Sequence, residues 1–178
     1  MPHPPSSEEL TLAAGRHLRL VVRNGWEYVA RRKASGIVVI LALTGHGGLV
    51  LVTQWREPAG AWVVELPAGL AGDLPGQEAE ELAVAARREL QEETGFTAAT
   101  LEPVLSGPPS PGISSEIVTF FRARELSRTG RGGGGAGERI RTHVVPLGRL
   151  EEWLAHVQQL GFQVDPKVLA GAWLVRKS

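Results

Sequence analysis

The sequence predicts an α+β protein, in which helices pack on both sides of a mixed β-sheet as an α/β/α sandwich. Short apolar and β-branched runs dominate the first 70 residues, and only three later stretches, residues 78–95, 149–161 and 165–177, have helical character. Mixed strands with few helices favour layers built around a sheet. A length of 178 residues suits one compact domain.

The N-terminal region divides into two parts. Residues 1–9 are polar and rich in proline, so we expect them to be disordered. Residues 10–35 are expected to form a small antiparallel β unit. Two strand-like runs in this unit flank Asn24-Gly25, a dipeptide typical of tight hairpins.

The central region predicts three strands followed by a helix. The strands are expected at residues 36–43, 48–55 and 61–69, the last of them stopped by Pro67 and Gly69. Residues 78–95 then change to a helical pattern rich in Ala, Leu, Glu and Arg. Gly95 stands at the expected C-cap of this helix.

The C-terminal half adds strands and two helices. Strand-like runs occur at residues 100–105, 116–123 and 139–147, and helices are expected at 149–161 and 165–177, the second with Asp165 as its N-cap. Residues 128–138 contain a run of glycines and are expected to form a mobile loop. Residues 36–178 would together form one catalytic domain.

Composition excludes several classes of function. The chain has no cysteine, which rules out disulfides, thiol nucleophiles and thiolate metal sites, so any metal must be held mainly by oxygen. Nineteen basic residues balance nineteen acidic ones, and no strong positive field is available to hold nucleic acid. The N-terminus lacks a signal-peptide pattern and no apolar run is long enough to span a bilayer. We therefore expect a cytoplasmic protein without a membrane or nucleic-acid partner.

The helix at residues 78–95 carries an unusual set of carboxylates. Glu89 and Glu93 are four residues apart and share one stripe, while Glu92 lies to one side, near Arg88. Two such glutamates repel each other, and a divalent cation between them would reverse the sign of the interaction. A solvated amphipathic helix with an Arg88–Glu92 ion pair explains the same spacing, so spacing alone does not establish a metal site.

The residue order is more specific than the spacing. The segment from Glu80 to Phe96 resembles the Nudix signature, G-x5-E-x7-R-E-U-x-E-E-x-G-U. Glu80 is followed by seven residues and then by the run Arg88-Glu89-Leu90-Gln91-Glu92-Glu93-Thr94-Gly95-Phe96. Every fixed position from Glu80 to Phe96 is met. The leading glycine is not, because position 74 is Leu74. Gly69 lies eleven residues before Glu80 instead of six, which indicates a five-residue insertion within residues 71–77.

The resemblance implies a Nudix fold and a role for each matching residue. Glu89, Glu92, Glu93 and the main-chain carbonyl of Ala68 would hold Mg²⁺ or Mn²⁺. Arg88 and Glu80 would orient these carboxylates. Cations held in this way polarise phosphoryl oxygens and activate water, which is most of what phosphoryl transfer requires.

A second segment narrows the substrate class. Ser110-Pro111-Gly112 followed by Glu116 resembles the S-P-G-x-x-x-E segment of ADP-ribose and nucleotide-sugar pyrophosphatases, and Pro111 lies sixteen residues after Gly95, the spacing typical of that subgroup. A proline turn leading into a strand explains the segment equally. The substrate-binding residues that the resemblance implies are Trp26, Glu27, Arg56, Gly69, Pro111 and Glu116.

Two of these positions leave alternatives open. Arg56 would donate bidentate hydrogen bonds to phosphate oxygens. Trp26, with Tyr28 in the same N-terminal region, would stack on a nucleobase, or it would simply pack on the sheet. The resemblance further implies that the unit of residues 10–35 is exchanged or packed across a homodimer.

The general base has the thinnest support. The subgroup places it on a mobile loop, and the glycine-rich loop of this chain retains one glutamate there, Glu138. Glycine would let the loop close over substrate. Alternatively, Glu138 is a solvated charge on a flexible connector, and Glu116 or another residue is the base.

Together these residues predict metal-dependent hydrolysis of the pyrophosphate of ADP-ribose or a nucleoside diphosphate sugar, which gives a nucleoside monophosphate and a sugar phosphate. A Nudix hydrolase acting on coenzyme A, a dinucleoside polyphosphate or a nucleoside triphosphate is an alternative. So is a domain that senses a nucleotide sugar without cleaving it. The sequence leaves open the nucleobase, the sugar, the identity and number of the metal ions, and the effect of the insertion.

Overall fold

The computed structural model describes residues 8–135 and 137–177. The disorder expected for residues 1–9 therefore lies outside the described residues, except at Glu8 and Glu9. Glu9 contacts the N-terminal sheet, since its Oε2 accepts hydrogen bonds from the Tyr28 hydroxyl at 2.6 Å and from the Arg23 guanidinium at 2.8 Å.

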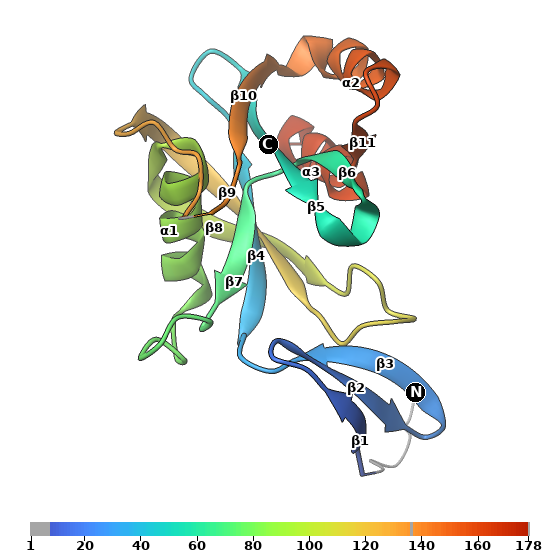
Figure 1. The fold of residues 1–178 in the computed structure, drawn as a ribbon. Coiled ribbons are helices and arrows are strands. Elements are labelled where there is room, and N and C mark those ends of the chain that lie inside the picture. Colours follow the sequence, from blue (N-terminus) through green and yellow to red (C-terminus); the bar gives the residue numbers. More distant parts are fainter. Residues whose placement is uncertain (1–7, 136, 178) are drawn as a thin grey trace.

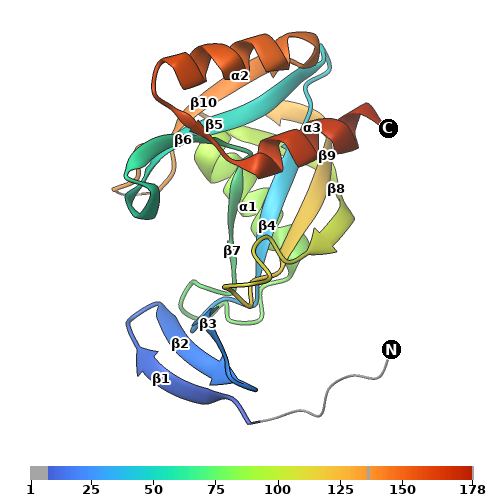
Figure 2. The ribbon, with the colours of Figure 1, turned by 90° about the vertical axis from the view of Figure 1, so that its right-hand side faces the viewer.

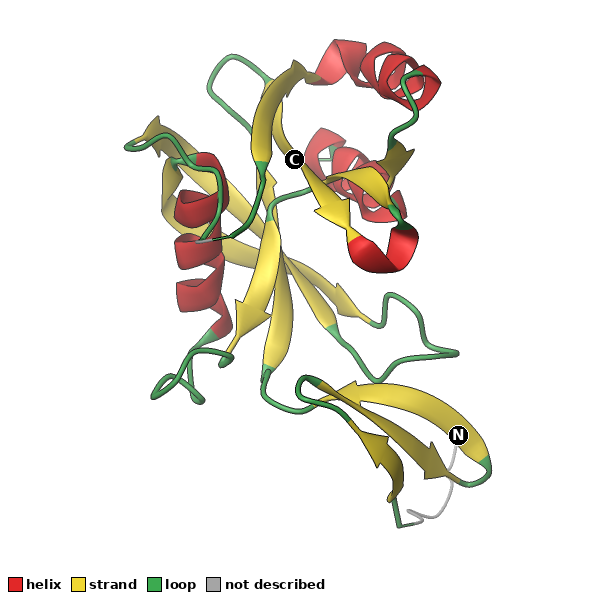
Figure 3. Cartoon of the chain, viewed as in Figure 1, coloured by secondary structure: helices red, strands yellow, loops and turns green. Residues whose placement is uncertain are grey.

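Eleven strands and three helices make up the described chain (Figures 1 and 3). No helix among the described residues is long and apolar enough to cross a membrane. The N-terminal sheet contains β1 (Leu10–Ala14), β2 (Leu18–Arg23) and β3 (Trp26–Arg31) in this order. The second sheet has the order β7 (Ala68–Ala71), β4 (Gly36–Ala42), β9 (Val118–Arg128), β8 (Phe96–Gly107). The third has the order β10 (Arg141–Pro146), β5 (Gly48–Arg56), β6 (Ala61–Glu65), β11 (Gln163–Val164).

The helices lie on opposite sides of the two four-stranded sheets. Helix α1 (Leu82–Thr94) packs on β7, β4 and β8, whereas α2 (Leu150–Gln159) and α3 (Pro166–Arg176) cover the other side. Strand β4 separates two hydrophobic cores. Val38 and Ile40 belong to the core beneath α1, and Val39 and Leu41 belong to the core beneath α2 and α3. Both four-stranded sheets are mixed, since each contains one parallel pair. The predicted α/β/α sandwich is confirmed.

The single strand expected at residues 61–69 is wrong. The chain leaves β6 at Glu65, crosses through Leu66 and Pro67, and enters the other sheet as β7. Proline has no N–H to donate to a sheet, so β6 ends before it. The Pro67 carbonyl accepts a hydrogen bond from the Ile40 backbone at 2.8 Å. Strand β7 consequently runs alongside α1, where the carboxylates lie.

Other boundaries differ because tertiary pairing, which the local pattern does not show, defines them. Helix α1 begins at Leu82, not at residue 78, and turns fill residues 72–81. Strand β8 is twelve residues long because it pairs with almost the whole of β9. The short strands β1 and β11 are absent from the sequence prediction, and each exists through pairing with one neighbour.

The N-terminal sheet projects from the body of the molecule, as Figure 2 shows. Its β2–β3 hairpin turns at Asn24 and Gly25, with φ of 54° and 78°, as the dipeptide predicts. Strand β3 contacts the segment at residues 110–116 of the same chain. The Val29 N–H donates to the Ile113 carbonyl at 2.9 Å, and the Val29 carbonyl accepts from the Ser115 N–H at 3.1 Å.

Candidate active site

Helix α1 lies against β7 through a close approach at Gly69. A Cβ at Gly69 would stand 1.9 Å from the Glu89 Cδ, so any other residue there would displace the Glu89 carboxylate. At its C-terminal end the helix closes on Gly95, whose φ is 73° and whose N–H donates to the Gln91 carbonyl. Gly69 was expected to bind substrate. In the structure it makes room for the carboxylate of Glu89.

Arg88 joins the carboxylates of α1 to β7. Its guanidinium donates two hydrogen bonds of 3.1 Å to Glu80, one of 2.9 Å to the Leu70 carbonyl and one of 2.7 Å to Glu89. Glu92 is further away, at 3.4 Å. The guanidinium of Arg88 holds the pKa of Glu80 below its usual range. Glu80 and Arg88 thus form a fixed ion pair beneath the metal-binding carboxylates implied by the signature.

Glu89 and Glu93 are carboxylates in an unfavourable environment. Burial raises the pKa of Glu93 to about 8, and the charges of Glu89 and Glu138 act in the same direction. Burial likewise raises the pKa of Glu89 to about 7. The Ala68 N–H donates to Glu93 Oε2 at 3.1 Å and so fixes that carboxylate beside the start of β7. A nearby cation would remove the cost of ionising both groups.

The donor set fits a hard divalent cation, because it consists only of oxygen. Glu89, Glu93 and Ala68 lie side by side, and the Glu92 side chain is half exposed and free to turn toward them. In the present arrangement no three acidic, His or Cys side chains of the described residues converge as a metal-binding cluster. Binding therefore requires Glu92 to rotate and Glu89 to loosen its bond with Arg88.

The insertion predicted between Gly69 and Glu80 forms a turn-rich loop beside this ion pair. The Gly72 N–H donates to Glu80 Oε2 at 3.3 Å, and Asp73 lies 3.8 Å from the Arg88 guanidinium. The additional residues therefore bulge outward and return Glu80 to Arg88. The motif keeps its ion pair despite the departure from the expected spacing.

The glycine-rich loop rests on the C-terminal end of α1. The N–H groups of Gly133 and Gly134 donate to the carbonyls of Glu93 and Glu92, at 2.9 Å and 3.0 Å. The loop that we expected to be mobile is thus held, in this structure, by the helix that bears the carboxylates. Glu138 is exposed, and its Oε2 accepts the Gly135 N–H at 2.8 Å. Its charge is close enough to contribute to the raised pKa of Glu93.

A cavity of about 740 Å³ opens between the two four-stranded sheets. Arg56 lines it and donates to both carboxylate oxygens of Glu65, at 2.7 Å to 3.1 Å. Gln54 donates to the same carboxylate at 2.7 Å. The sequence analysis gave Glu65 no role. Gln54 pairs with Val63 across the two strands, and Glu65 lies two positions further along β6. Diagonal neighbours of this kind are close enough for long polar side chains to interact.

Comparison with known proteins decides the family. The NUDIX domain matches residues 31–161, which is most of the chain. This chain belongs to the Nudix family. Its fold is similar to that of a solved ADP compounds hydrolase, with a TM-score of 0.72 and 22% identity over 99% of this chain and 94% of the other.

Curated Nudix relatives cover part of the chain. An ADP-ribose pyrophosphatase of Bacillus subtilis is 42% identical over 95 residues, 53% of this chain and 49% of the relative. A GDP-mannose pyrophosphatase of Cronobacter sakazakii is 33% identical over 134 residues, 71% of this chain and 66% of the relative. The chain therefore spans about half the length of the first relative and about two thirds of the second.

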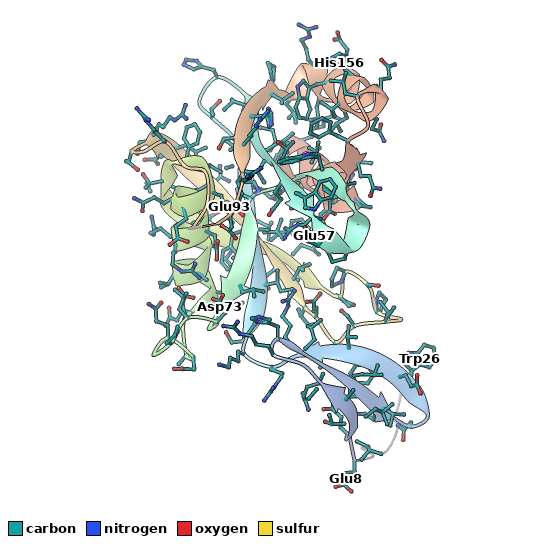
Figure 4. The ribbon with its side chains drawn as sticks, viewed as in Figure 1. Glu8, Trp26, Glu57, Asp73, Glu93 and His156 are labelled. Carbon is teal, nitrogen blue, oxygen red and sulfur yellow. The ribbon has the colours of Figure 1, made fainter. Side chains whose placement is uncertain are left out.

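Three of the expected substrate-binding residues lie away from the Nudix helix. Trp26 and Glu27 occupy the tip of the N-terminal sheet, at the far end of the molecule from Glu93 in Figure 4. Trp26 is 61% exposed, and its indole N–H donates to the Gly112 carbonyl at 3.1 Å. Pro111 is exposed next to Gly112 and does not line the cavity. Within one chain, none of the three meets the carboxylates.

Glu116 has a different position from these three. It lines the cavity and accepts a hydrogen bond of 2.6 Å from Arg31 of the N-terminal sheet. Arg31, which the sequence gave no reason to single out, forms an ion pair with Glu116. Glu116 is thus both at the cavity and tied to the N-terminal sheet.

Proposed function

We propose that this protein hydrolyses the pyrophosphate of ADP-ribose or a nucleoside diphosphate sugar and requires Mg²⁺ or Mn²⁺. The observation that carries the proposal is the buried pair Glu89–Glu93, with the charge of Glu93 acting on Arg56, which lines the cavity. Buried carboxylates with raised pKa values indicate a site that is completed by a cation. The products would be a nucleoside monophosphate and a sugar phosphate.

Each residue has one role in the proposed reaction. Arg56, whose guanidinium is oriented by its hydrogen bonds to Glu65, binds the phosphates and orients them. Glu138 accepts a proton from the attacking water, whose oxygen bonds to phosphorus while the bridging P–O bond breaks. The sugar phosphate leaves with the bridging oxygen. Glu89, Glu92, Glu93 and the Ala68 carbonyl would hold the cation, which supplies charge stabilisation for the phosphoryl oxygens when it is bound.

The names of the relatives support this substrate class. The Bacillus subtilis and Cronobacter sakazakii proteins are described as acting on ADP-ribose and on GDP-mannose. Both compounds are nucleoside diphosphates linked to a sugar. The shared chemistry is the pyrophosphate between a nucleoside and a sugar, which leaves the base and the sugar of the present substrate to be measured.

A substrate panel tests the proposal. ADP-ribose, ADP-glucose, GDP-mannose, coenzyme A, diadenosine tetraphosphate and ATP would each be incubated with Mg²⁺, with Mn²⁺ and with EDTA. Phosphate released after phosphatase treatment would be the readout. We expect metal-dependent cleavage to be fastest with one of the nucleotide sugars. Preference for coenzyme A, the dinucleotide or ATP would contradict the substrate class, and binding without turnover would indicate a sensor.

We further propose that the protein works as a homodimer. The N-terminal sheet exposes leucines on β1 and β2, namely Leu10, Leu12, Leu18 and Leu20. An apolar sheet with open edges favours pairing with a second copy. Pairing would also bring Trp26 to a partner's cavity. Light scattering at micromolar concentration should report a dimer. A fully active monomer would contradict both the homodimer and the role of Trp26 at a partner's cavity.

A further inference from the structure

The cavity beside Arg56 has a second polar group on the same wall. Arg56 and Glu65 line the cavity, and the hydrogen bond to Glu65, with the charges of Glu93 and Asp165, raises the pKa of Arg56 despite its burial. Strand β11 and the beginning of α3 continue this wall, because β11 pairs with β6 and the Asp165 N–H donates to the Val64 carbonyl at 3.0 Å. Asp165 and Lys167 line the cavity there, and Leu105, Val118 and Phe120 of the other sheet form an apolar side.

Asp165 and Lys167 hold each other in place. Asp165 Oδ1 accepts the Lys167 backbone N–H at 2.8 Å and so caps α3, while Oδ2 pairs with the Lys167 ammonium. The side chains are 14% and 32% exposed, respectively. Each group is thus partly buried, and both residues line the cavity. The charge of Asp165 also contributes to the raised pKa of Arg56, which places the pair within electrostatic range of that guanidinium.

The pair has hydrogen-bonding capacity left over. An ammonium carries three N–H donors, of which Asp165 takes one, and each carboxylate oxygen has two acceptor sites. The two charges cancel, so the pair offers a donor and an acceptor side by side without attracting a second phosphate. Neighbouring hydroxyls of a sugar present a matching acceptor and donor. The apolar wall opposite would take the C–H face of the ring.

We propose that Asp165 and Lys167 form a subsite that binds the neighbouring hydroxyls of a ribose ring attached to the pyrophosphate. The inference rests on the proposed function, because Arg56 must hold the phosphates for the ring to reach the neighbouring Asp165–Lys167 pair. The ring belongs either to the nucleoside or to the distal sugar, which have the same chemistry. The subsite contributes affinity and selects substrates that carry the hydroxyls.

Two substitutions test the subsite. Asp165→Asn removes the charge but keeps an efficient helix cap, and Lys167→Met removes the donors but keeps the length of the side chain. Arg149→Met is the matched control, because it breaks the exposed Arg149–Glu152 pair on the other side of the molecule. We expect KM for ADP-ribose to rise about tenfold in both test variants, with kcat within about threefold, the pattern for lost uniform binding. The control should leave both constants unchanged.

Two analogues identify the ring. One lacks the 2′ and 3′ hydroxyls of the adenosine ribose, and the other lacks the corresponding hydroxyls of the distal ribose. The effect of Lys167→Met on KM should vanish with the analogue whose hydroxyls the pair binds. An effect that persists with both analogues, or an unchanged KM for ADP-ribose, overturns the subsite.

Calorimetric Kd values separate this inference from the function on which it rests. If the wild-type protein binds ADP-ribose but does not cleave it, the proposed function fails, and the subsite is still read from the Kd values. A Kd for ADP-ribose raised about tenfold in both variants supports the subsite. A Kd equal to that of the wild-type protein overturns it.

Discussion

The Nudix helix and the N-terminal sheet are attached to the molecule in opposite ways. Helix α1 is fixed by the close approach at Gly69, by the four partners of Arg88 and by the loop that docks on its last carbonyls. The N-terminal sheet projects from the body and is joined to it at one segment, through Val29, Trp26 and Arg31.

This difference separates chemistry from recognition. A group that must be placed within a fraction of an ångström needs a rigid support, and α1 has one. A surface that recognises a base or a second chain tolerates a looser attachment and exposes its apolar residues, as Trp26 and the leucines of β1 and β2 do. We therefore assign the proposed chemistry to α1 and the proposed contacts with a base or a second chain to the N-terminal sheet.

The largest effect is expected from the carboxylates themselves. Glu93→Gln and Glu89→Gln each remove a charged oxygen ligand while keeping the shape of the side chain. We expect kcat to fall at least about a hundredfold, because the cation carries the charge stabilisation in this mechanism. Steady-state rates with Mg²⁺ check this, with the exposed Glu152→Gln on α2 as the control. Near-normal turnover in either folded variant would contradict the assignment of these glutamates as metal ligands.

The second-largest loss of activity is expected from substitution of Glu138. Glu138→Gln keeps the hydrogen bond from the Gly135 N–H but removes the proton acceptor. We expect kcat to fall by roughly a hundredfold with little change in KM, the usual scale for losing a general base. Glu102→Gln, an exposed residue of β8, is the control. A loss smaller than about threefold would move the role to Glu116 and require its bond with Arg31 to open.

The sequence predicted the rigid region better than the projecting one. The order of residues from Glu80 to Phe96 specifies a helix, its cap and its ion pair, because these contacts are local or belong to one motif. Asp165 and the Asn24-Gly25 turn were likewise predictable from local chemistry. Local patterns determine such features without knowledge of the rest of the fold.

Features that depend on distant partners were not predictable. Arg31 meets Glu116 across 85 positions of sequence, and β11 exists only because it pairs with β6. The change of sheet at Pro67 is also a long-range event: the proline shows where a strand stops, but not that the chain resumes beside α1. The hydrogen bond from the Trp26 indole to the Gly112 carbonyl likewise joins residues 86 positions apart.

Gly69 offers a smaller test of how closely Glu89 packs on β7. Gly69→Ala places a methyl group on the Glu89 carboxylate, so that side chain must move off β7. Because a side chain and not the backbone gives way, the cost is about 1 kcal/mol, the low end for overpacking, and we expect Tm to fall by roughly 3 °C. Thermal unfolding without metal measures this change. Gly45→Ala is the matched control, because a Cβ at Gly45 meets nothing within 4 Å. Equal Tm values for the two variants would show that the approach at Gly69 is not tight.

The smallest effect concerns the dependence of stability on pH, and it applies to the metal-free protein. Burial raises the pKa of Glu93 to about 8, well above the value near 4.5 of an unfolded chain. Below pH 4.5 the carboxyl is protonated in both states and folding carries no penalty. Between pH 4.5 and 8 the folded state binds more protons than the unfolded one, so stability falls as pH rises, and it levels off above pH 8.

Thermal unfolding in EDTA from pH 5 to 8.5 measures this slope. His143 acts in the opposite direction, because burial lowers its pKa and stability then rises as pH passes about 6.5. The difference between the wild-type protein and Glu93→Gln removes the contribution of His143, which is common to both. It reports Glu93 together with its interaction with Glu89, whose pKa burial raises to about 7. We expect Glu93→Gln to gain at least about 3 °C in Tm relative to the wild type across this range, since glutamine cannot ionise. Mg²⁺ should raise the wild-type Tm more at pH 8 than at pH 5, because a cation binds the ionised pair. Parallel curves for the two proteins would mean that Glu93 ionises without cost and that water reaches the carboxylates between β7 and α1.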